Sequence, residues 1–295
     1  MDKYLIDDEK KEKERKKLEC IITKLNKAGH KTDHLINYIH CLTVKQYLKL
    51  NSSYFLPLSE SSVYDPLGTI TKTNYAYLYI PDYIGYYRES ASRAEDISDR
   101  FSYIILNLID KLYKKDPVGW IFDLRKNDGG IIHSFILGFS SILNYFTIHC
   151  KNKKGKVILD LVYQDEHLYY QYIGEKAKIL GLLPPLNKIK IDNVSVLIDD
   201  DTASCGELLT YLLKKQYNAV IYGEPSYGLS TWMELYEIPG YDNLVDNMVL
   251  RYPELIFDFS DSDLKYVNTK KYKDTPVLSI APDQNLIPYD KFGIF

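Results

Sequence analysis

The sequence lacks a long hydrophobic run, since no apolar stretch approaches the roughly 18 residues of a membrane-spanning helix and the residues after Met1 are mostly charged. We therefore expect no contact with a membrane. Cysteines are few: Cys20, Cys41, Cys150 and Cys205 are widely spaced, without a Cys-x-x-Cys pair or a disulfide framework. A reducing compartment suits this pattern, and we expect a cytoplasmic or otherwise intracellular protein.

The sequence also lacks an excess of basic residues. Its 40 acidic and 37 basic side chains give a net charge of −3, so it offers no positive field that would hold a phosphate backbone. We expect no nucleic-acid partner. With 45% hydrophobic and 26% charged residues and no repeat or low-complexity tract, the chain is predicted to fold. Its 295 residues suffice for one main domain with an appendage.

The first part of the chain has helical patterns only. Residues 8–18 are almost entirely charged, and Leu18, Ile21, Ile22 and Leu25 then recur at helical spacing. Two further helical patterns follow before the Asn-Ser-Ser break at residues 51–53. We predict an N-terminal helical subdomain over residues 1–55.

From residue 75 onward the pattern changes to alternating strands and helices, which is typical of βαβ units and predicts an α/β core with parallel pairing over residues 70–295. A polar turn near residue 165 indicates a hairpin inserted near 150–185. Strands are predicted at 75–80, 119–124, 157–162, 168–172, 194–198, 219–222, 231–238 and 276–280, and helices at 97–112, 132–143 and 208–213.

Three polar motifs each follow a predicted strand: Asp-Leu-Arg-Lys-Asn-Asp-Gly-Gly at 123–130, Thr-Ala-Ser-Cys-Gly-Glu at 202–207, and Gly-Glu-Pro-Ser-Tyr-Gly at 223–228. The carboxyl ends of parallel strands are where open α/β folds assemble sites, because helix N-termini present free N–H groups there. A nucleophilic serine needs a base and N–H donors for the oxyanion. Ser204 and the Gly129-Gly130 pair supply the nucleophile and donors in this interpretation.

Each motif also has a purely structural interpretation. Ser204 and Glu207 form the Ser-x-x-Glu pattern of a helix capping box, placed directly before the apolar residues of a predicted helix. Gly129 and Gly130 fit an ordinary tight turn between strand and helix. The combination of the three motifs, in this order, favours a site.

In order and approximate spacing, these motifs closely resemble the S41 tail-specific (C-terminal processing) serine peptidases. The nearest resemblance is to the subgroup of the nisin-resistance protein, which has no PDZ domain. It runs from about Asn51 to Asp290 and includes Tyr-Ile-Pro at 79–81 and Ile-Ala-Pro-Asp at 280–283. The resemblance implies a ClpP/crotonase-like core, a peptide or protein substrate, and neither a cofactor nor a metal.

Carried over onto this sequence, the resemblance makes Ser204 the nucleophile. The amide of Cys205 and that of Gly129 or Gly130 form the oxyanion hole, and Glu207 matches the acidic residue of the family pattern.

The sequence departs from the family at the general base. Lys-dependent members carry the base just after the second Gly of the Gly-x-x-x-x-Gly turn, where this chain has Leu229, and His-dependent members carry a His that aligns with Ser52. Neither residue accepts a proton at neutral pH. His133, at the start of the helix after Gly130, is the candidate substitute, although it also suits a surface or helix-cap histidine.

Three functions therefore stay open. The first is a serine endopeptidase with Ser204 as nucleophile, and the second is a catalytically inactive relative that binds extended peptides. The third is a crotonase-like acyl-transfer enzyme, since that fold also builds oxyanion holes from backbone amides. His30 and His34 share a helix face with Asp33 between them in sequence, but a solvated helix is the preferred interpretation and no metal site is predicted. The oligomeric state is left open.

Overall fold

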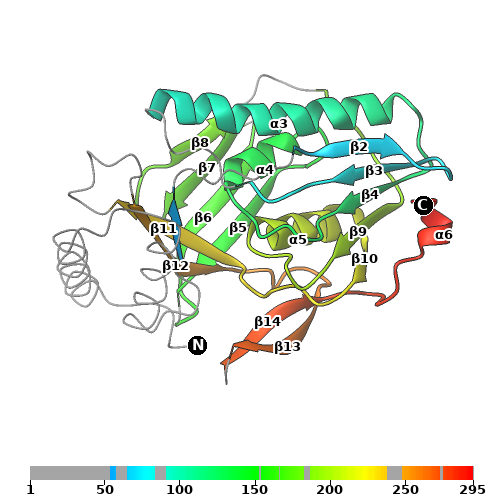
Figure 1. Ribbon diagram of the computed structural model, residues 1–295. Coiled ribbons are helices and arrows are strands. Elements are labelled where there is room, and N and C mark those ends of the chain that lie inside the picture. Colours follow the sequence, from blue (N-terminus) through cyan, green and yellow to red (C-terminus); the bar gives the residue numbers. More distant parts are fainter. Residues whose placement is uncertain are drawn as a thin grey trace, which may run out of the picture.

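The structure is a computed structural model. It describes residues 54–57, 65–83, 91–152, 154–165, 167–182, 187–237, 248–272 and 275–294. These form two large sheets, a two-stranded hairpin and several helices (Figure 1). The helices are α3 (Ala91–Tyr113), α4 (Ile132–Gly138), α5 (Cys205–Tyr217) and α6 (Tyr289–Phe292).

The five-stranded sheet has the order β10-β9-β4-β3-β2, with parallel pairing from β10 to β3 and an antiparallel β2 at the edge. Parallel strands are commonly buried on both faces and read as continuous apolar runs. Strands β4 and β9 follow this rule, since every residue in them is buried. Its strands are β2 (Leu67–Ile70), β3 (Tyr75–Tyr79), β4 (Gly119–Asp123), β9 (Val194–Ile198) and β10 (Val220–Gly223).

Different segments cover the two faces of this sheet. Trp120 and Phe122 of β4 point into the main core, where α3 packs on β2 and β3 and α5 packs on β9 and β10. Ile121 points to the opposite face, where it clusters with Tyr222 and with Phe292 of α6. The C-terminal segment therefore covers the face that the larger helices leave open, and Figure 1 shows the C-terminus beside β9 and β10.

The seven-stranded sheet has the order β1-β12-β5-β6-β7-β8, with β11 also paired to β12, and its pairs are all antiparallel. Leu159, Leu161 and Leu168 join the same main core, and α4 contacts β7 and β8. The main core thus lies between the two sheets, and α3, α4 and α5 contribute to it. Its strands are β1 (Tyr54–Pro57), β5 (Phe146–Lys151), β6 (Val157–Gln164), β7 (His167–Tyr172), β8 (Lys178–Leu182), β11 (Thr231–Glu237) and β12 (Met248–Phe257).

Strands β13 (Lys265–Tyr272) and β14 (Thr275–Ala281) form a hairpin, which lies at the bottom of Figure 1, at the opposite end of the view from α3. No helix in the described ranges has both the length and the apolar character needed to cross a membrane.

The predicted α/β class and its ClpP/crotonase-like core are confirmed. The predicted helix 132–143 was too long, because α4 ends at Gly138, where one nearby and one distant side chain bind the carbonyl groups at and after its end. Ser140 Oγ donates to Leu137 O at 2.6 Å, and Lys188 Nζ donates to Ser140 O and Leu143 O. The predicted helices of residues 1–55 lie outside the described residues. Of this range the structure describes only Tyr54 and Phe55, which begin β1.

Candidate active site

The three motifs meet at the carboxyl ends of β4, β9 and β10. Because these strands are parallel neighbours, their following loops lie side by side. Leu124 N donates to Leu197 O at 2.9 Å, and Tyr227 N donates to Thr202 O at 2.8 Å. The sheet topology therefore brings together segments about 25 to 75 residues apart in sequence.

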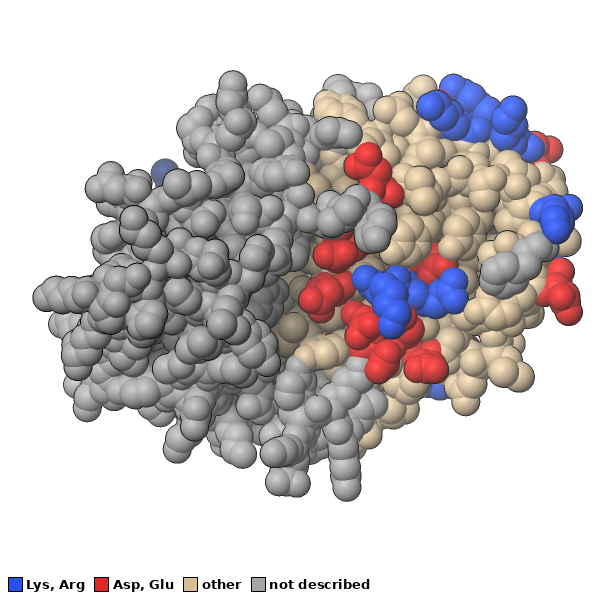
Figure 2. All heavy atoms as spheres, in the orientation of Figure 1, with Lys and Arg blue, Asp and Glu red and all other residues tan. Residues whose placement is uncertain are grey.

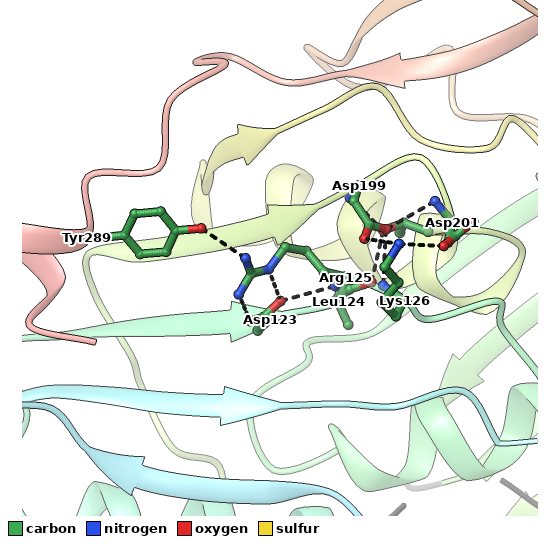
Figure 3. A network of polar contacts seen from close by, with 8 residues as sticks. Asp123, Leu124, Arg125, Lys126, Asp199, Asp201 and Tyr289 are labelled. Carbon is green, nitrogen blue, oxygen red and sulfur yellow. Dashed lines mark hydrogen bonds and ion pairs between the residues drawn. The ribbon is translucent and has the colours of Figure 1, made fainter. Parts of the chain in front are cut away.

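Several hydrogen bonds join the loop after β4 to the loop that precedes Ser204. Thr202 Oγ1 donates to Leu124 O at 2.9 Å, and Lys126 N donates to Asp199 Oδ1 at 3.0 Å. Lys126 Nζ also lies 2.7 Å from Asp201 Oδ2 (Figure 3). Because most of these bonds involve the backbone, the two loops hold a defined relative position.

Behind the loop, Asp123 and Arg125 form a bidentate ion pair (Figure 3). Asp123 is almost fully buried, and Tyr77 Oη donates to its Oδ2 at 2.6 Å. Arg125 also reaches Tyr289 Oη of α6 at 3.1 Å, and its bonds to Asp123 raise the pKa of the guanidinium. Arg125 thus ties the C-terminal segment to the sheet.

Ser204 lies at the N-terminus of α5 in an unusual backbone conformation, with φ 49° and ψ −111°. Its side chain makes no capping hydrogen bond, so the capping-box interpretation of Ser204 and Glu207 is wrong. A positive φ in a residue with a Cβ costs about 1–3 kcal/mol and is commonly found at functional sites. In serine hydrolases of the α/β class a sharp strand-to-helix turn exposes the hydroxyl in this way.

The two glycines of the first motif lie against the chain on either side. A Cβ on Gly129 would lie 2.6 Å from Ser204 Cβ, and one on Gly130 would lie 1.9 Å from Tyr83 O. Their φ angles are 96° and 137°, which residues with a Cβ rarely adopt. Glycine is therefore required at both positions by conformation and by space.

Cys205, the first residue of α5, is buried, and its Sγ donates to Gly130 O at 3.2 Å. Its thiol therefore points to the glycine loop, while Ser204 occupies the turn. The N-terminal end of a helix carries partial positive charge, which favours an anion at this place.

Glu207 turns away from the start of its helix and binds the third motif. Its carboxylate is fully buried and accepts hydrogen bonds from Ser226 Oγ at 2.5 Å, Gly228 N at 2.8 Å and Ser230 Oγ at 3.0 Å. Burial raises the pKa of this carboxyl, and the donors oppose that shift. Glu207 therefore holds the loop in which Leu229 lies.

His133 lies in the first turn of α4, and its Cβ would be 3.5 Å from a Cβ on Gly181 of β8. Burial lowers the pKa of its imidazole to about 4, so the ring is neutral at pH 7. Among the described residues, no hydrogen bond joins His133 to Ser204. Ser52, aligned with the family's His, lies outside the described residues.

Acidic side chains gather beside the site. The pKa of the Asp128 carboxyl is raised to about 6, first by burial and then by the carboxylates of Asp82 and Asp201, although part of the side chain reaches solvent. Figure 2 shows acidic residues around a few basic ones on this face. Within the described ranges no group of three or more His, Cys, Asp or Glu side chains could hold a metal ion.

Asn127, to which the sequence assigned no role, is fully buried and bonds to residues 80 and 81, to Ala203 and to Gly129 of its own loop. The sequence contained a signal for this role. A polar residue that lies between a buried strand and two glycines has few possible hydrogen-bond partners other than backbone groups.

The fold is that of the ClpP/crotonase-like class, and the three motifs meet at the carboxyl ends of its parallel strands. The sequence profile of peptidase family S41 matches residues 74–270, about two thirds of the chain. The chain therefore belongs to peptidase family S41.

Individual relatives are more distant. The chain is 28% identical to the carboxy-terminal processing protease CtpA of Bacillus subtilis (strain 168) over 127 residues, which are 43% of this chain and 23% of CtpA. The chain thus aligns with less than a quarter of that relative. A lipoprotein from Streptococcus agalactiae has the same fold, with a TM-score of 0.55, 17% identity and coverage of 88% of this chain and 80% of the other. The photosystem II D1 C-terminal processing protease aligns with a TM-score of 0.43, 14% identity and coverage of 79% and 48%.

Proposed function

We propose that this chain is a serine peptidase that cleaves peptide or protein substrates with Ser204 as nucleophile. The observation that carries the proposal is the strained turn of Ser204, packed against Gly129 at the N-terminus of α5. A capping or purely structural serine needs no such conformation. Membership of family S41 supports the same reaction class.

In the proposed reaction Ser204 Oγ attacks the scissile carbonyl carbon, and a base takes the hydroxyl proton. The carbonyl electron pair moves to the oxygen, which backbone amides of Cys205 and the glycine loop stabilise. The C–N bond then breaks as the leaving amine receives the proton, and water hydrolyses the acyl-enzyme. This chemistry calls for no metal or organic cofactor.

We propose His133 as the proton acceptor, because its imidazole is neutral at physiological pH. A pKa of about 4 makes it a weak base, and general-base help is worth about 10²–10⁴ in rate. A slow enzyme is therefore expected.

A fluorophosphonate probe tests the proposal on the full chain. Wild-type protein is expected to be labelled at Ser204, as located by peptide mass spectrometry, and Ser204→Ala to remain unlabelled. The peptidase proposal would be contradicted if folded protein, as checked by circular dichroism, were not labelled at high probe concentration.

Leu229 favours a second candidate, an inactive relative that binds extended peptides. In the sequence alignment Leu229 takes the position of the base of Lys-dependent members, in a loop that Glu207 holds through Gly228 and Ser230. In that case Ser204→Ala would bind an unstructured protein such as casein as tightly as wild type does, and neither would cleave it. We further propose an intracellular location, since the four cysteines are widely spaced in the sequence and form no Cys-x-x-Cys pair.

A further inference from the structure

We propose that Asn127 is the positioning residue of the oxyanion loop: its side chain engages the Gly129 amide and so leaves the Gly130 amide as the loop's donor to the reacting oxygen. The inference deepens the proposed function and rests on it. It states which of the two glycine amides, Gly129 or Gly130, donates to the oxyanion, a choice that the sequence leaves open.

The Asn127 side chain uses both ends of its carboxamide. Nδ2 donates to Ile80 O at 2.9 Å and to Pro81 O at 3.1 Å, and Oδ1 accepts from Gly129 N at 2.9 Å. Its own carbonyl accepts from Ala203 N at 2.9 Å. One buried residue thus joins the end of β3, the glycine loop and the residue before Ser204.

The bond from Gly129 N fixes which amide is available. A buried N–H that already donates at 2.9 Å to a good acceptor cannot turn to a second acceptor without breaking that bond. An oxyanion at Ser204 would therefore have to compete with Asn127 for Gly129, at a cost in rate. Gly129 is accordingly a poor oxyanion donor.

The N–H of the peptide group between Gly129 and Gly130 is arranged differently from the Gly129 N–H. Gly129 O accepts from Tyr83 N at 2.9 Å, and the peptide bond to Gly130 is trans. In a trans peptide the N–H points away from the carbonyl, so the Gly130 N–H points away from Tyr83. Within the part of the chain that the structure describes, no hydrogen bond engages this N–H.

Contacts on both sides hold Gly130 in place. Ile131 N donates to Tyr83 O at 2.8 Å, and Cys205 Sγ donates to Gly130 O at 3.2 Å. The preceding residue touches Ser204, since a Cβ on Gly129 would lie 2.6 Å from Ser204 Cβ and 3.0 Å from Cys205 N. The Gly130 amide is therefore held in a fixed position directly after the residue that touches Ser204, and oxyanion stabilisation requires such a preorganised donor.

Asparagine suits this role because it combines two donors with an acceptor on one short side chain. Aspartate would keep an acceptor for Gly129 N but lose both donors to residues 80 and 81. Asn193 offers a matched control at the other end of the same sheet, where its Nδ2 donates to Val118 O at 2.8 Å.

The first experiment measures amide hydrogen exchange by NMR on protein labelled with ¹⁵N-glycine, whose 15 glycines keep the spectrum simple. The Gly129 amide is expected to exchange about tenfold or more slowly than the Gly130 amide, and Asn127→Ala to remove the difference. Equal protection of the two amides in wild type, or protection of Gly129 that survives in Asn127→Ala, would overturn the inference. This experiment does not depend on activity.

The second experiment measures fluorophosphonate labelling over a range of probe concentrations. Asn127→Ala and Asn127→Asp are expected to lower the limiting rate constant by about 10–100-fold, with the apparent probe affinity within about threefold, because losing one oxyanion donor outright costs about 10²–10³. Asn193→Asp is expected to label at the wild-type rate. Labelling of folded Asn127 variants at the wild-type rate would overturn the inference alone, whereas an unlabelled wild type would count against the proposed function and leave the exchange result to decide the inference.

Discussion

Gly129 and Ser204 pack so closely that a Cβ on the glycine would lie 2.6 Å from the Cβ of the serine, a separation that real Cβ atoms essentially never show. The loop after β4 therefore leaves no room for a side chain next to Ser204. This contact links the first and second motifs of the sequence in space.

Gly129→Ala is expected to lower stability and to abolish labelling of Ser204, for two reasons. The new methyl group must displace the Ser204 side chain, and the alanine backbone must adopt a φ near 96°. Gly155→Ala is the matched control, since Gly155 also has a positive φ, 75°, but has nothing within 4 Å. Thermal unfolding and probe labelling check both variants. Labelling of Gly129→Ala at the rate of Gly155→Ala would contradict the close contact.

The conformation of Ser204 predicts that a glycine in its place stabilises the fold. Ser204→Gly relieves the backbone strain at φ 49° and ψ −111°, because glycine has no Cβ. Ser204→Ala keeps this strain and removes only the hydroxyl. Ser204→Gly should therefore be more stable than Ser204→Ala by about 1 kcal/mol or more, despite the greater chain entropy of glycine. Urea unfolding of the two variants measures the difference, and a less stable glycine variant would argue against backbone strain.

Glu207→Gln is expected to destabilise the protein by about 1–3 kcal/mol, because an amide NH₂ would face hydroxyl and N–H donors in a fully buried site. Glu224→Gln, exposed in the neighbouring loop, is expected to have an effect below about 0.5 kcal/mol. Denaturant melts compare the two. Equal stability of the two variants would mean that Glu207 does not hold the loop.

The pH dependence of stability should separate His133 from Asp128. The pKa of His133 falls from 6.5 to about 4 on folding. Between pH 6.5 and about pH 4 the imidazole is therefore protonated in the unfolded state but not in the folded state, and acidification destabilises the fold through this group. The pKa of Asp128 rises from 3.8 to about 6, so acid stabilises the folded state through this group.

On acidification from about pH 7 to about pH 4.5, His133→Gln should therefore lose less stability than wild type, and Asp128→Asn should lose more. Thermal melts at both pH values, in moderate salt, measure the two differences. Because Asp128 still reaches solvent, its effect should be the smaller one and should weaken as salt is added. A loss in His133→Gln as large as that in wild type would contradict the burial of His133, and a loss in Asp128→Asn no larger than that in wild type would contradict the raised pKa of Asp128.

Leu229→Lys tests whether a missing base limits the reaction. The variant places an amine at the position that the sequence resemblance aligns with the lysine base, in a loop that binds Glu207 through the Gly228 amide and Ser230. Labelling of Ser204 is expected to accelerate by about 10²-fold or more. Leu229→Met is the control for size without an amine, and equal rates in the two variants would show that the loop does not bring residue 229 to Ser204.

Much of the fold follows from local patterns in the sequence. Strands β4 and β9 are apolar runs, and α3 and α5 carry apolar residues at helical spacing, so their positions could be predicted. Strand β12 was missed because Pro253 interrupts it. The structure places Pro253 beside a register shift opposite Trp232 and Met233, where a strand tolerates a residue without an N–H.

Strand β5 was missed for a different reason. Its buried Phe146, Ile148 and Cys150 alternate with exposed Thr147 and His149, which is a strand pattern, but it directly follows a helical one. The point where α4 ends depends on Lys188, a residue about 50 positions away. Local periodicity does not contain that information.

By itself the sequence determined the parallel strands β3, β4, β9 and β10, the helices α3 and α5 and the family, because these depend on short-range periodicity and on motifs read along the chain. The tertiary structure alone decided that Glu207 binds the loop of residues 226–230 instead of capping its helix, and that Asn127 occupies the Gly129 amide. Both outcomes depend on which backbone groups from distant segments compete for one buried side chain. That competition exists only after the strands have paired.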